Sequence, residues 1–471
     1  MDHFRYADGR LFAEGVDLTD LAARFGTPTY VYSRRTLTMH YDRLVEAFAE
    51  LSPLICYSVK SCSNLHVLRA LAERGCGMDV VSGGELYRTR VVGVPGGRVL
   101  YAGVGKTEEE IREALGEDAE PMTNSAAAPG DGPTEFQRRR APALPPISAA
   151  GATPEPIGMF NIESEAEFHT IAGISRQLGV EARAALRVNP DVDPRTHAYT
   201  TTGKAENKFG VDLRRAREFF QHFGRHPNLR LTGLHIHLGS PINSVQPYVE
   251  AITKVLSLVD ELAGLGFVID TLDLGGGFAA DYQSGVSLAA SDYAAAIVPM
   301  LRDRARAGMK FIIEPGRTIS ANAGVLLTRV QYVKQSGVKK FIVCDAGMHT
   351  LIRPALYGAF HFIWPASVAS QHEPPRRAEK LDLPGLETAD VVGPICESGD
   401  FLAKDRLLPP VARGDVLAVF AAGAYGMAMA SRYNSHPLPA EVMVEHNTST
   451  LIRRRESYAD LVRDELDAAL S

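Results

Sequence analysis

Hydrophobic residues follow one repeating pattern from about residue 52 to residue 318. Short apolar runs alternate with longer stretches in which apolar residues recur at helical spacing. This alternation is typical of right-handed β-α-β units, whose strands form a parallel sheet. The pattern predicts strands over 54–59, 78–81, 98–102, 159–162, 184–188, 231–238, 269–274 and 310–313.

Helical spacing separates these eight runs. The predicted helices are 64–74, 84–92, 107–115, 164–178, 213–223, 245–265 and 291–307. Eight β-α units are the number that a closed (β/α)8 barrel of the TIM type needs. An open, doubly wound sheet is the alternative, but eight repeats favour closure.

The pattern changes after residue 320. Strand-like runs at 325–334, 339–344, 390–393 and 415–420 are separated by turns without helices, which predicts an antiparallel β domain. Short strand candidates at 4–6, 10–12 and 29–33 are expected to add to it. We therefore predict a barrel over 34–318 and a discontinuous β domain of residues 1–33 and 319–471, which completes the active site.

Composition narrows the class of protein. The chain has 471 residues, is 45% hydrophobic and carries a net charge of -6, which argues against nucleic-acid binding. The first residues do not resemble a signal peptide, and no apolar run approaches the roughly 18 residues of a membrane span. Five cysteines without a C-x-x-C pair favour a reducing cytoplasm. Residues 117–156 hold 8 of the 28 prolines and are expected to form a low-complexity insertion.

Candidate chemistry gathers where the predicted strands end, which is the catalytic end of such barrels. Lys60 follows the first strand; buried there, a lysine loses its proton more easily and forms a Schiff base. His235 and His237 share one face of the sixth strand. That pair fits a metal site, a ring that stacks on a planar cofactor, or two hydrogen-bonded core histidines.

The seventh and eighth strands end in a pattern that suits a phosphate group. Gly275, Gly276 and Gly277 expose backbone N–H groups, and Glu314-Pro315-Gly316-Arg317 follows the next strand. Barrel phosphate sites commonly lie after these two strands. A lysine, a phosphate cradle, a carboxylate and an aromatic ring together predict a pyridoxal phosphate site.

These segments carry a resemblance to a known family. The chain resembles the fold-type III, pyridoxal-phosphate-dependent decarboxylases of ornithine, lysine, arginine and diaminopimelate, with an alanine-racemase-like barrel, and within them the diaminopimelate branch. The resemblance covers nearly the whole chain except 117–156. It rests on YSVKSCSNLHVLRALAERGCGMDVVSGGELYR, GLHIHLGS, LDLGGGF, IIEPGRTI, CDAGMHTLIRPALYGAFH, VVGPICESGDFLAKDR, AGAYGMAMASRYN and PAEVMV. Pro241 is a departure, because the family usually has glutamine after HLGS.

The resemblance implies specific roles. Lys60 would hold pyridoxal 5'-phosphate as an internal aldimine, Glu314 would pair with the pyridine nitrogen, and Cys396 would return a proton to the carbanion. Pairing with Glu314 keeps that nitrogen protonated, so that the ring accepts the electrons left by CO2. The other implied cofactor ligands are Asp79, His237, which would stack on the ring, Ser240, Gly275, Gly276, Gly277, Gly316, Arg317 and Tyr425.

The distal end of the substrate separates diaminopimelate from simpler amino acids. Meso-diaminopimelate ends in an ammonium and a carboxylate, whereas ornithine ends in an ammonium alone. Glu397 suits the ammonium. A site built to bind both an ammonium and a carboxylate rejects a substrate that lacks either group, because a buried charge of the site is then left unpaired. The residues suited to the carboxylate or the substrate edge are Arg317, Arg353, Tyr357 and Tyr425.

The expected function is therefore decarboxylation of meso-2,6-diaminopimelate to L-lysine and CO2, the last step of lysine biosynthesis. The resemblance also implies a head-to-tail homodimer in which Cys396 and Glu397 cross the interface. Three alternatives stay open: a decarboxylase of another basic amino acid or of carboxynorspermidine, a metal-dependent barrel hydrolase, and a non-catalytic homologue. The hydrolase is disfavoured because no acid is expected in a ligating pattern with His235 and His237, so no metal is expected.

Overall fold

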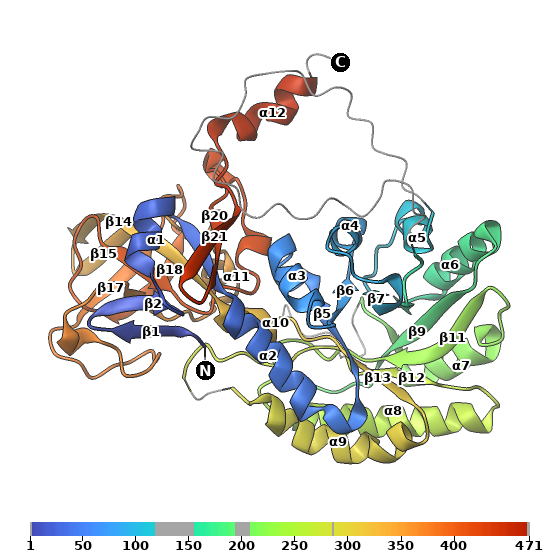
Figure 1. The fold of residues 1–471 in the computed structure, drawn as a ribbon. Coiled ribbons are helices and arrows are strands. Elements are labelled where there is room, and N and C mark those ends of the chain that lie inside the picture. Colours follow the sequence, from blue (N-terminus) through green and yellow to red (C-terminus); the bar gives the residue numbers. More distant parts are fainter. Residues whose placement is uncertain (1, 118–154, 194–207, 285–286, 469–471) are drawn as a thin grey trace. The chain divides into compact units, whose positions relative to one another are not determined.

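Eight parallel strands close into a barrel (Figure 1). The computed structural model describes residues 2–117, 155–193, 208–284 and 287–468. Each barrel strand pairs with the next along the chain, and the last pairs with the first, so the predicted closed barrel is confirmed. In ring order the strands are β5 (Leu54–Ser58), β6 (Gly77–Val80), β7 (Val99–Tyr101), β8 (Met159–Ile162), β9 (Ala182–Asn189), β11 (Leu229–His235), β12 (Thr271–Asp273) and β13 (Lys310–Ile313). The short β10 (Val211–Asp212) pairs in parallel with the end of β9.

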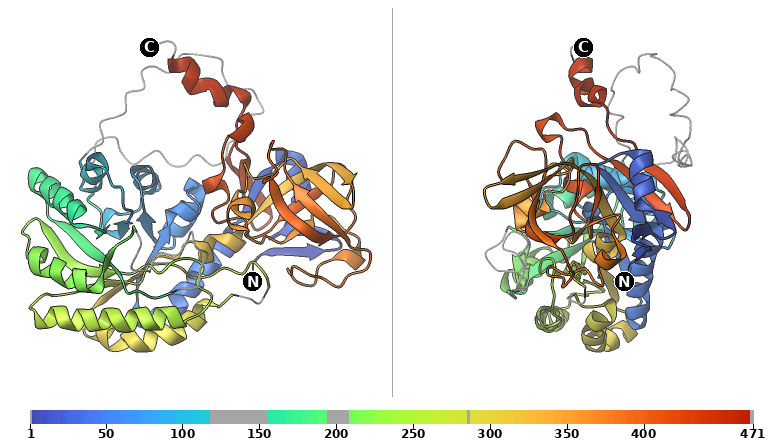
Figure 2. Two further views of the ribbon diagram at one scale, coloured as in Figure 1. Left: turned by 180° about the vertical axis from the view of Figure 1, so that it is seen from behind. Right: turned by 90° about the vertical axis from the view of Figure 1, so that its left-hand side faces the viewer.

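Helices follow the strands and lie outside the ring, where neighbouring helices contact one another (Figures 1 and 2). Several begin at a side chain that accepts a backbone N–H, as Thr107, Ser164 and Asp212 do. All seven predicted helices are confirmed within two residues. They are α3 (Leu65–Ala72), α4 (Gly83–Val91), α5 (Glu108–Ala114), α6 (Glu165–Leu178), α7 (Leu213–Phe223), α8 (Gln246–Gly264) and α9 (Ala290–Arg306).

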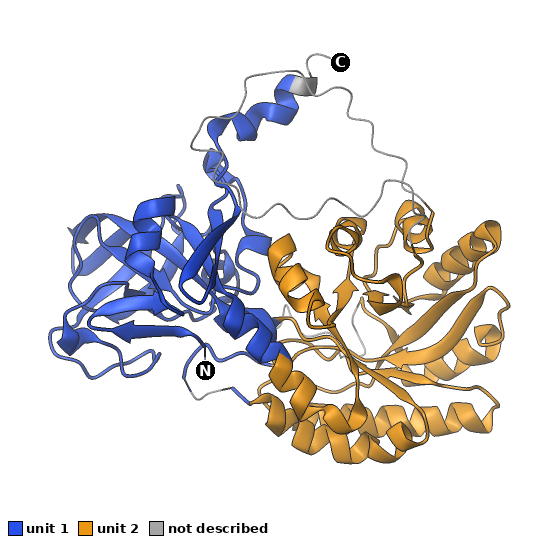
Figure 3. Cartoon of the chain, in the orientation of Figure 1, with its two compact units in different colours: residues 1–41, 279–288, 317–471 blue, residues 42–278, 289–316 orange. Residues whose placement is uncertain are grey.

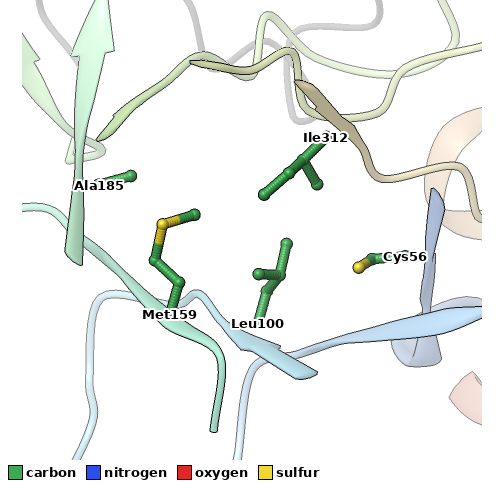
Figure 4. Close-up of a cluster of buried hydrophobic side chains, with 5 residues drawn as sticks. All are labelled: Cys56, Leu100, Met159, Ala185 and Ile312. Carbon is green, nitrogen blue, oxygen red and sulfur yellow. The ribbon is translucent and has the colours of Figure 1, made fainter. Parts of the chain in front are cut away.

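Side chains from alternate positions of the strands fill the barrel interior. One buried cluster, drawn in Figure 4, takes residues from five of the eight strands. Its members are Cys56, Leu100, Met159, Ala185 and Ile312. Because the interior is packed with apolar side chains, polar chemistry is confined to the strand ends.

The remaining strands form mainly antiparallel sheets. In the larger sheet, β4, near the N-terminus, lies between β14 and β20, which come from the C-terminal third of the chain. Two pairings are parallel, β15 with β17 and β4 with β20. The order is β18 (Phe401–Leu408), β17 (Glu387–Val392), β15 (Lys339–Cys344), β14 (Gly324–Ser336), β4 (Thr29–Ser33), β20 (Ala440–Glu445) and β21 (Thr448–Arg453).

Shorter elements complete this part of the chain. The strand β19 pairs with both β14 and β16, and three N-terminal strands form a small sheet of their own. These elements are β1 (Phe4–Ala7), β2 (Arg10–Ala13), β3 (Val16–Asp17), β16 (Ile363–Pro365), β19 (Val416–Val419), α1 (Leu18–Phe25), α2 (Arg34–Ala47), α10 (Arg317–Ser320), α11 (Arg353–Tyr357) and α12 (Tyr458–Ala468).

The chain divides into two compact units (Figure 3). The barrel unit comprises residues 42–278 and 289–316, and the β unit comprises residues 1–41, 279–288 and 317–471. Residues 279–288, between β12 and α9, thus belong to the β unit. Apart from its ends, the expected insertion at 117–156 lies outside the described residues. Among the helices that are described, none is both long and apolar enough to cross a membrane.

Candidate active site

Lys60 lies in a short turn directly after β5, at the carboxyl end of the barrel strands. Its Nζ is 3.1 Å from Oδ2 of Asp79, which comes from the adjacent strand β6. The same Oδ2 is 2.8 Å from the hydroxyl of Ser58, which donates to it. Asp79 is fully buried, whereas 36% of the Lys60 side chain is exposed. The amine is therefore in contact with a buried carboxylate, on a side chain that is itself only partly buried.

Glu314 follows β13, the strand on the other side of β5. Its carboxylate is buried and lies 3.4 Å from Nε2 of His235 and 4.0 Å from Nδ1 of His237. Burial alone would raise the pKa of Glu314. The nearby imidazole of His235 and the ammonium of Lys60 outweigh that effect and lower the pKa below its ordinary value. Glu314 is thus an ionised carboxylate inside the barrel.

Two further buried residues surround Glu314, and neither was singled out from the sequence. Asn161, at the end of β8, donates through Nδ2 to Oε1 of Glu314 (3.0 Å) and to Oδ2 of Asp273 (3.1 Å). Burial and the neighbouring Glu314 hold the pKa of Asp273 well above its ordinary value. The signal available in the sequence was a polar residue at the end of an otherwise apolar strand run.

One expectation about the histidines is wrong. His235, Asp273 and Glu314 each place a ligand atom within 4.8 Å of the others, so two acids do stand in a ligating pattern with one of the two histidines. The alternation of residues in β11 does not predict which acids lie near its histidines. Those acids come from other segments, Asp273 from β12 and Glu314 from the position after β13. By distance alone this group could hold a metal ion as well as a cofactor.

The three glycines after β12 pack closely and are not a loose turn. A Cβ on Gly275 would lie 2.2 Å from the carbonyl oxygen of Ile236, and one on Gly276 would lie 2.3 Å from that of Glu314. Gly275 and Gly277 also have φ of +66° and +103°, which favour glycine. The backbone N–H of Gly276 donates to Nδ1 of His237 (3.1 Å).

His237 is therefore held as a neutral ring. Its Nδ1 accepts the Gly276 N–H, so the proton of the neutral form resides on Nε2. Burial, together with the cations Arg187 and Lys60, lowers the pKa of His237 well below its ordinary value. A neutral imidazole at this position suits stacking on a planar ring.

Ser240 and Gly316 lie in loops that adjoin this region of the barrel unit. The Ser240 loop runs beside the glycines, since the N–H of Ile242 donates to the carbonyl of Gly277 (2.9 Å). A Cβ on Gly316 would lie 3.0 Å from Cβ of Ser58. The backbones therefore approach closely around the strand ends that carry Lys60 and Glu314.

A second group of predicted residues lies within the β unit. Nη1 of Arg317 donates to the hydroxyl of Tyr282 (2.8 Å), and the Arg317 guanidinium lies 4.8 Å from the ring centre of Tyr425. Arg353, at the start of α11, lies 4.8 Å from the ring centre of Tyr282. Tyr357 ends the same helix. Tyr282 was missed from the sequence; it follows the glycine run by five residues.

Cys396 and Glu397 form a third group, also within the β unit. Of the five cysteines, all free, only Cys396 is exposed. Cys396 is therefore not an inert, buried thiol. The backbone N–H of Cys396 donates to Oδ1 of Asn434 (3.1 Å), and the hydroxyl of Tyr433 donates to the carboxylate of Glu397. These partners are polar side chains that fix the segment locally.

The structure thus gathers the predicted residues into groups, each inside one unit. The barrel unit holds Lys60, Asp79, His237, Ser240, Gly275, Gly276, Gly277, Glu314 and Gly316. The β unit holds Arg317, Arg353, Tyr357, Tyr425, Cys396 and Glu397. Gly316 and Arg317 are consecutive in the chain, and one of the boundaries between the two units falls between them. The individual roles assigned to these side chains remain predictions.

Comparison with known proteins agrees with this geometry. Residues 34–127 and 150–321 match the family described as "Pyridoxal-dependent decarboxylase, pyridoxal binding domain". That match covers more than half of the chain and the whole barrel. It defines the class of this protein as a barrel enzyme of the pyridoxal-dependent decarboxylases.

Relatives of the full chain narrow the class. A diaminopimelate decarboxylase of Aquifex aeolicus is 42% identical over 99% of this chain and 98% of its own, and one of Pseudomonas aeruginosa is 41% identical over 99% of both. The structure of Helicobacter pylori diaminopimelate decarboxylase complexed with L-lysine has a TM-score of 0.80, is 34% identical, and covers 96% of this chain and all of its own. The chain belongs to the diaminopimelate decarboxylase family. The resemblance predicted from the sequence is confirmed, and the metal-dependent hydrolase is not supported.

Proposed function

We propose that this chain catalyses the pyridoxal-phosphate-dependent decarboxylation of meso-2,6-diaminopimelate to L-lysine and CO2, the last step of lysine biosynthesis. One observation carries the proposal. The amine of Lys60 and the ionised carboxylate of Glu314 follow adjacent strands of one barrel. A covalent anchor and a fixed negative charge are what the cofactor's aldehyde and pyridine nitrogen require. The full-length relatives support the same substrate.

The barrel residues fit the cofactor chemically. Lys60 would hold it covalently, Glu314 would keep its pyridine nitrogen protonated, and the neutral His237 would stack on its ring. The phosphate would lie against the bare backbone of Gly275, Gly276 and Gly277, with Ser240, Gly316, Arg317 and Tyr425. Because the N–H groups of Gly275 and Gly276 already donate to Asp273 and His237, Gly277 would supply the backbone donor of this run. Asp79 would position the amine of Lys60, which lies 3.1 Å from its carboxylate. When bound, the cofactor supplies an acceptor for the electrons of the bond that releases CO2.

The chain's own residues would complete the reaction. Loss of CO2 leaves the α-carbon with an electron pair that needs one proton. The exposed thiol of Cys396 is suited to deliver that proton, because Sγ is not enclosed by apolar side chains. The product then carries a hydrogen where the carboxylate stood, and Cys396 recovers its proton from solvent.

Selection of the substrate would depend on its distal centre. Arg353 and Tyr357, with Arg317 and Tyr425, present donors that suit the distal carboxylate. Glu397 presents a carboxylate that suits the distal ammonium. We expect purified protein with added cofactor to release CO2 from meso-diaminopimelate and not from L-lysine, L-ornithine or L-arginine. Release from one of those three, or from carboxynorspermidine, would contradict this substrate assignment.

Replacing Arg353 by alanine should impair recognition of the distal carboxylate. Losing a charge-assisted, bidentate contact costs about 2–3 kcal/mol, so kcat/KM for meso-diaminopimelate should fall by about 10²-fold. The matched control is Arg302→Ala, which removes a surface ion pair with Glu50 in the barrel unit and should leave kcat/KM within twofold. Steady-state CO2 release measures both. An R353A variant as active as the R302A variant would contradict the assignment.

We also propose a head-to-tail homodimer in the cytoplasm, with Cys396 and Glu397 donated to the partner's barrel. Exposure of Cys396 and Glu397 in the single chain supports the dimer, and five free thiols suit a reducing compartment. The proposed cofactor-binding domain is the predicted 34–318, and the predicted β domain of 1–33 and 319–471 would complete the site.

The proposal that each active site combines residues of both chains can be tested directly. Lys60→Ala and Cys396→Ala chains, each with its own affinity tag, are co-expressed and the mixed dimer is purified on both tags. One of its two sites then has both Lys60 and Cys396, so it should regain about half of the parental activity. Each variant purified alone should be nearly inactive. A mixed dimer as inactive as the single variants would show that each chain supplies its own thiol.

A further inference from the structure

Arg353 is a buried cation whose charge is not neutralised by an acid of its own unit. Only 6% of the residue is exposed. Within the described residues, no carboxylate lies within salt-bridge distance of its guanidinium, and burial lowers the pKa of Arg353. A guanidinium in such a place needs hydrogen-bond acceptors to remain in one orientation.

His361 supplies one acceptor, and its protonation is fixed by geometry. Nδ1 of His361 lies 2.9 Å from the carbonyl oxygen of Phe420, which can only accept, so Nδ1 carries the proton. Nε2 then has a free lone pair, and Nη1 of Arg353 donates to it over 2.8 Å. The neutral ring is therefore a matched acceptor for the guanidinium.

His361 is itself held firmly. It is fully buried, and its backbone carbonyl accepts a hydrogen bond from Nη1 of Arg406 (2.8 Å). Burial and the nearby Arg353 lower the pKa of His361 to about 3. The ring therefore stays neutral across the physiological pH range, so that it holds Arg353 without adding a competing positive charge.

Tyr282 also contacts the Arg353 guanidinium. Its ring centre lies 4.8 Å from the Arg353 guanidinium, while its hydroxyl accepts from Nη1 of Arg317 (2.8 Å). Burial alone would raise the pKa of Tyr282, but the guanidinium groups of Arg317 and Arg353 outweigh burial and lower it. One phenol side chain thus contacts both cations. Its ring also meets the His361 ring edge to face, with ring centres 5.4 Å apart.

We propose that His361 and Tyr282 are positioning residues for Arg353. They fix its guanidinium for the distal carboxylate of the substrate and do not neutralise its positive charge. This inference rests on the proposed function, because it assigns the device to diaminopimelate recognition. A carboxylate partner would hold Arg353 equally well, but it would cancel the charge that the substrate's carboxylate needs.

The test separates the two hydrogen bonds of His361. Asparagine keeps a donor near the Nδ1 position but is too short to accept from Arg353, whereas glutamine places an acceptor near the Nε2 position. We expect H361N to raise KM for meso-diaminopimelate at least about tenfold while kcat stays within about threefold. H361Q should restore KM to within about threefold of the parent. The visible absorbance of the bound cofactor should be the same in all three proteins.

A matched control and a second variant complete the design. His372 also bonds a backbone carbonyl, that of Pro384, but at the surface, so H372N should leave KM unchanged. Tyr282→Leu removes the ring beside Arg353 and should raise KM about tenfold. This second variant keeps the inference testable if H361N folds poorly. The inference is overturned if H361N keeps the parental KM, or if H361N and H361Q lose kcat and thermal stability alike. A parent protein that releases CO2 from another amino acid and not from diaminopimelate overturns the proposed function instead.

Discussion

Replacement of Lys60 by alanine is expected to reduce kcat for CO2 release by at least about 10³-fold, the largest effect of any single substitution in this chain. The reason is positional as well as chemical. Lys60 Nζ is held 3.1 Å from the buried Asp79 carboxylate, at the ends of two adjacent barrel strands. Alanine removes the only covalent anchor proposed for the cofactor. Borohydride reduction followed by peptide mapping should label Lys60 in the parent protein and no lysine in the variant.

The control for this prediction is another lysine of the same barrel. Lys310 begins β13, at the end of the strand opposite Glu314, and is exposed. Lys310→Ala should retain parental activity and reductive labelling at Lys60. If K60A kept more than a tenth of the parental kcat, or if labelling fell on another lysine, the proposed anchor would be wrong.

Replacement of Glu314 by glutamine should lower kcat by about 10²- to 10³-fold with little change in KM. Glutamine has nearly the same shape but carries no charge, so it cannot keep a pyridine nitrogen protonated. Nδ2 of Asn161 can still donate to the amide oxygen, as it does to Oε1 over 3.0 Å. Steady-state kinetics measure the fall in kcat. The absorbance of the bound cofactor reports separately whether its pyridine nitrogen is still protonated.

A surface carboxylate provides the comparison. Glu50 lies on the barrel unit and pairs with Arg302. Glu50→Gln makes the same chemical change outside the site and should leave kcat within twofold. Glu314→Asp, which keeps the charge on a shorter side chain, should lie between E314Q and the parent. A kcat for E314Q within fivefold of the parent would show that the charge of Glu314 is not used in the reaction.

The barrel could be predicted because its signal is local and repeated. Each of the eight apolar runs overlaps a strand, although β12 spans only Thr271–Asp273 within the predicted 269–274. The strand β11 ends at His235, so His237 lies beyond the strand on which it was predicted. The strands of the β unit were harder to predict from the sequence. The segment of β20 reads as a short apolar run. The segment of β18 has three charged residues between apolar ones, and neither segment is followed by a helical pattern that would mark it as a strand. Their pairing depends on contacts far along the chain, which local periodicity does not report.

Residues with a charge and a motif were found from the sequence, whereas neutral partners were not. Lys60 and Glu314 follow strand ends within recognisable segments. Asn161 lies outside those segments, and His361 only ends one of them, in a loop. Neither was singled out, because an amide in an apolar run and a histidine in a loop are common in any protein. Their importance comes from what they contact, which is Glu314 in one case and Arg353 in the other.

The sequence by itself determined the barrel, the order of its strands and the end of the barrel at which the chemistry lies. Strand and helix periodicity act over a few residues, and chain connectivity places every strand end on the same side. Only the tertiary structure decided the ionisation of the buried groups. Glu314 is ionised beside a buried Asp273 whose pKa is raised, and His361 is neutral, because burial and neighbours from distant segments set each pKa.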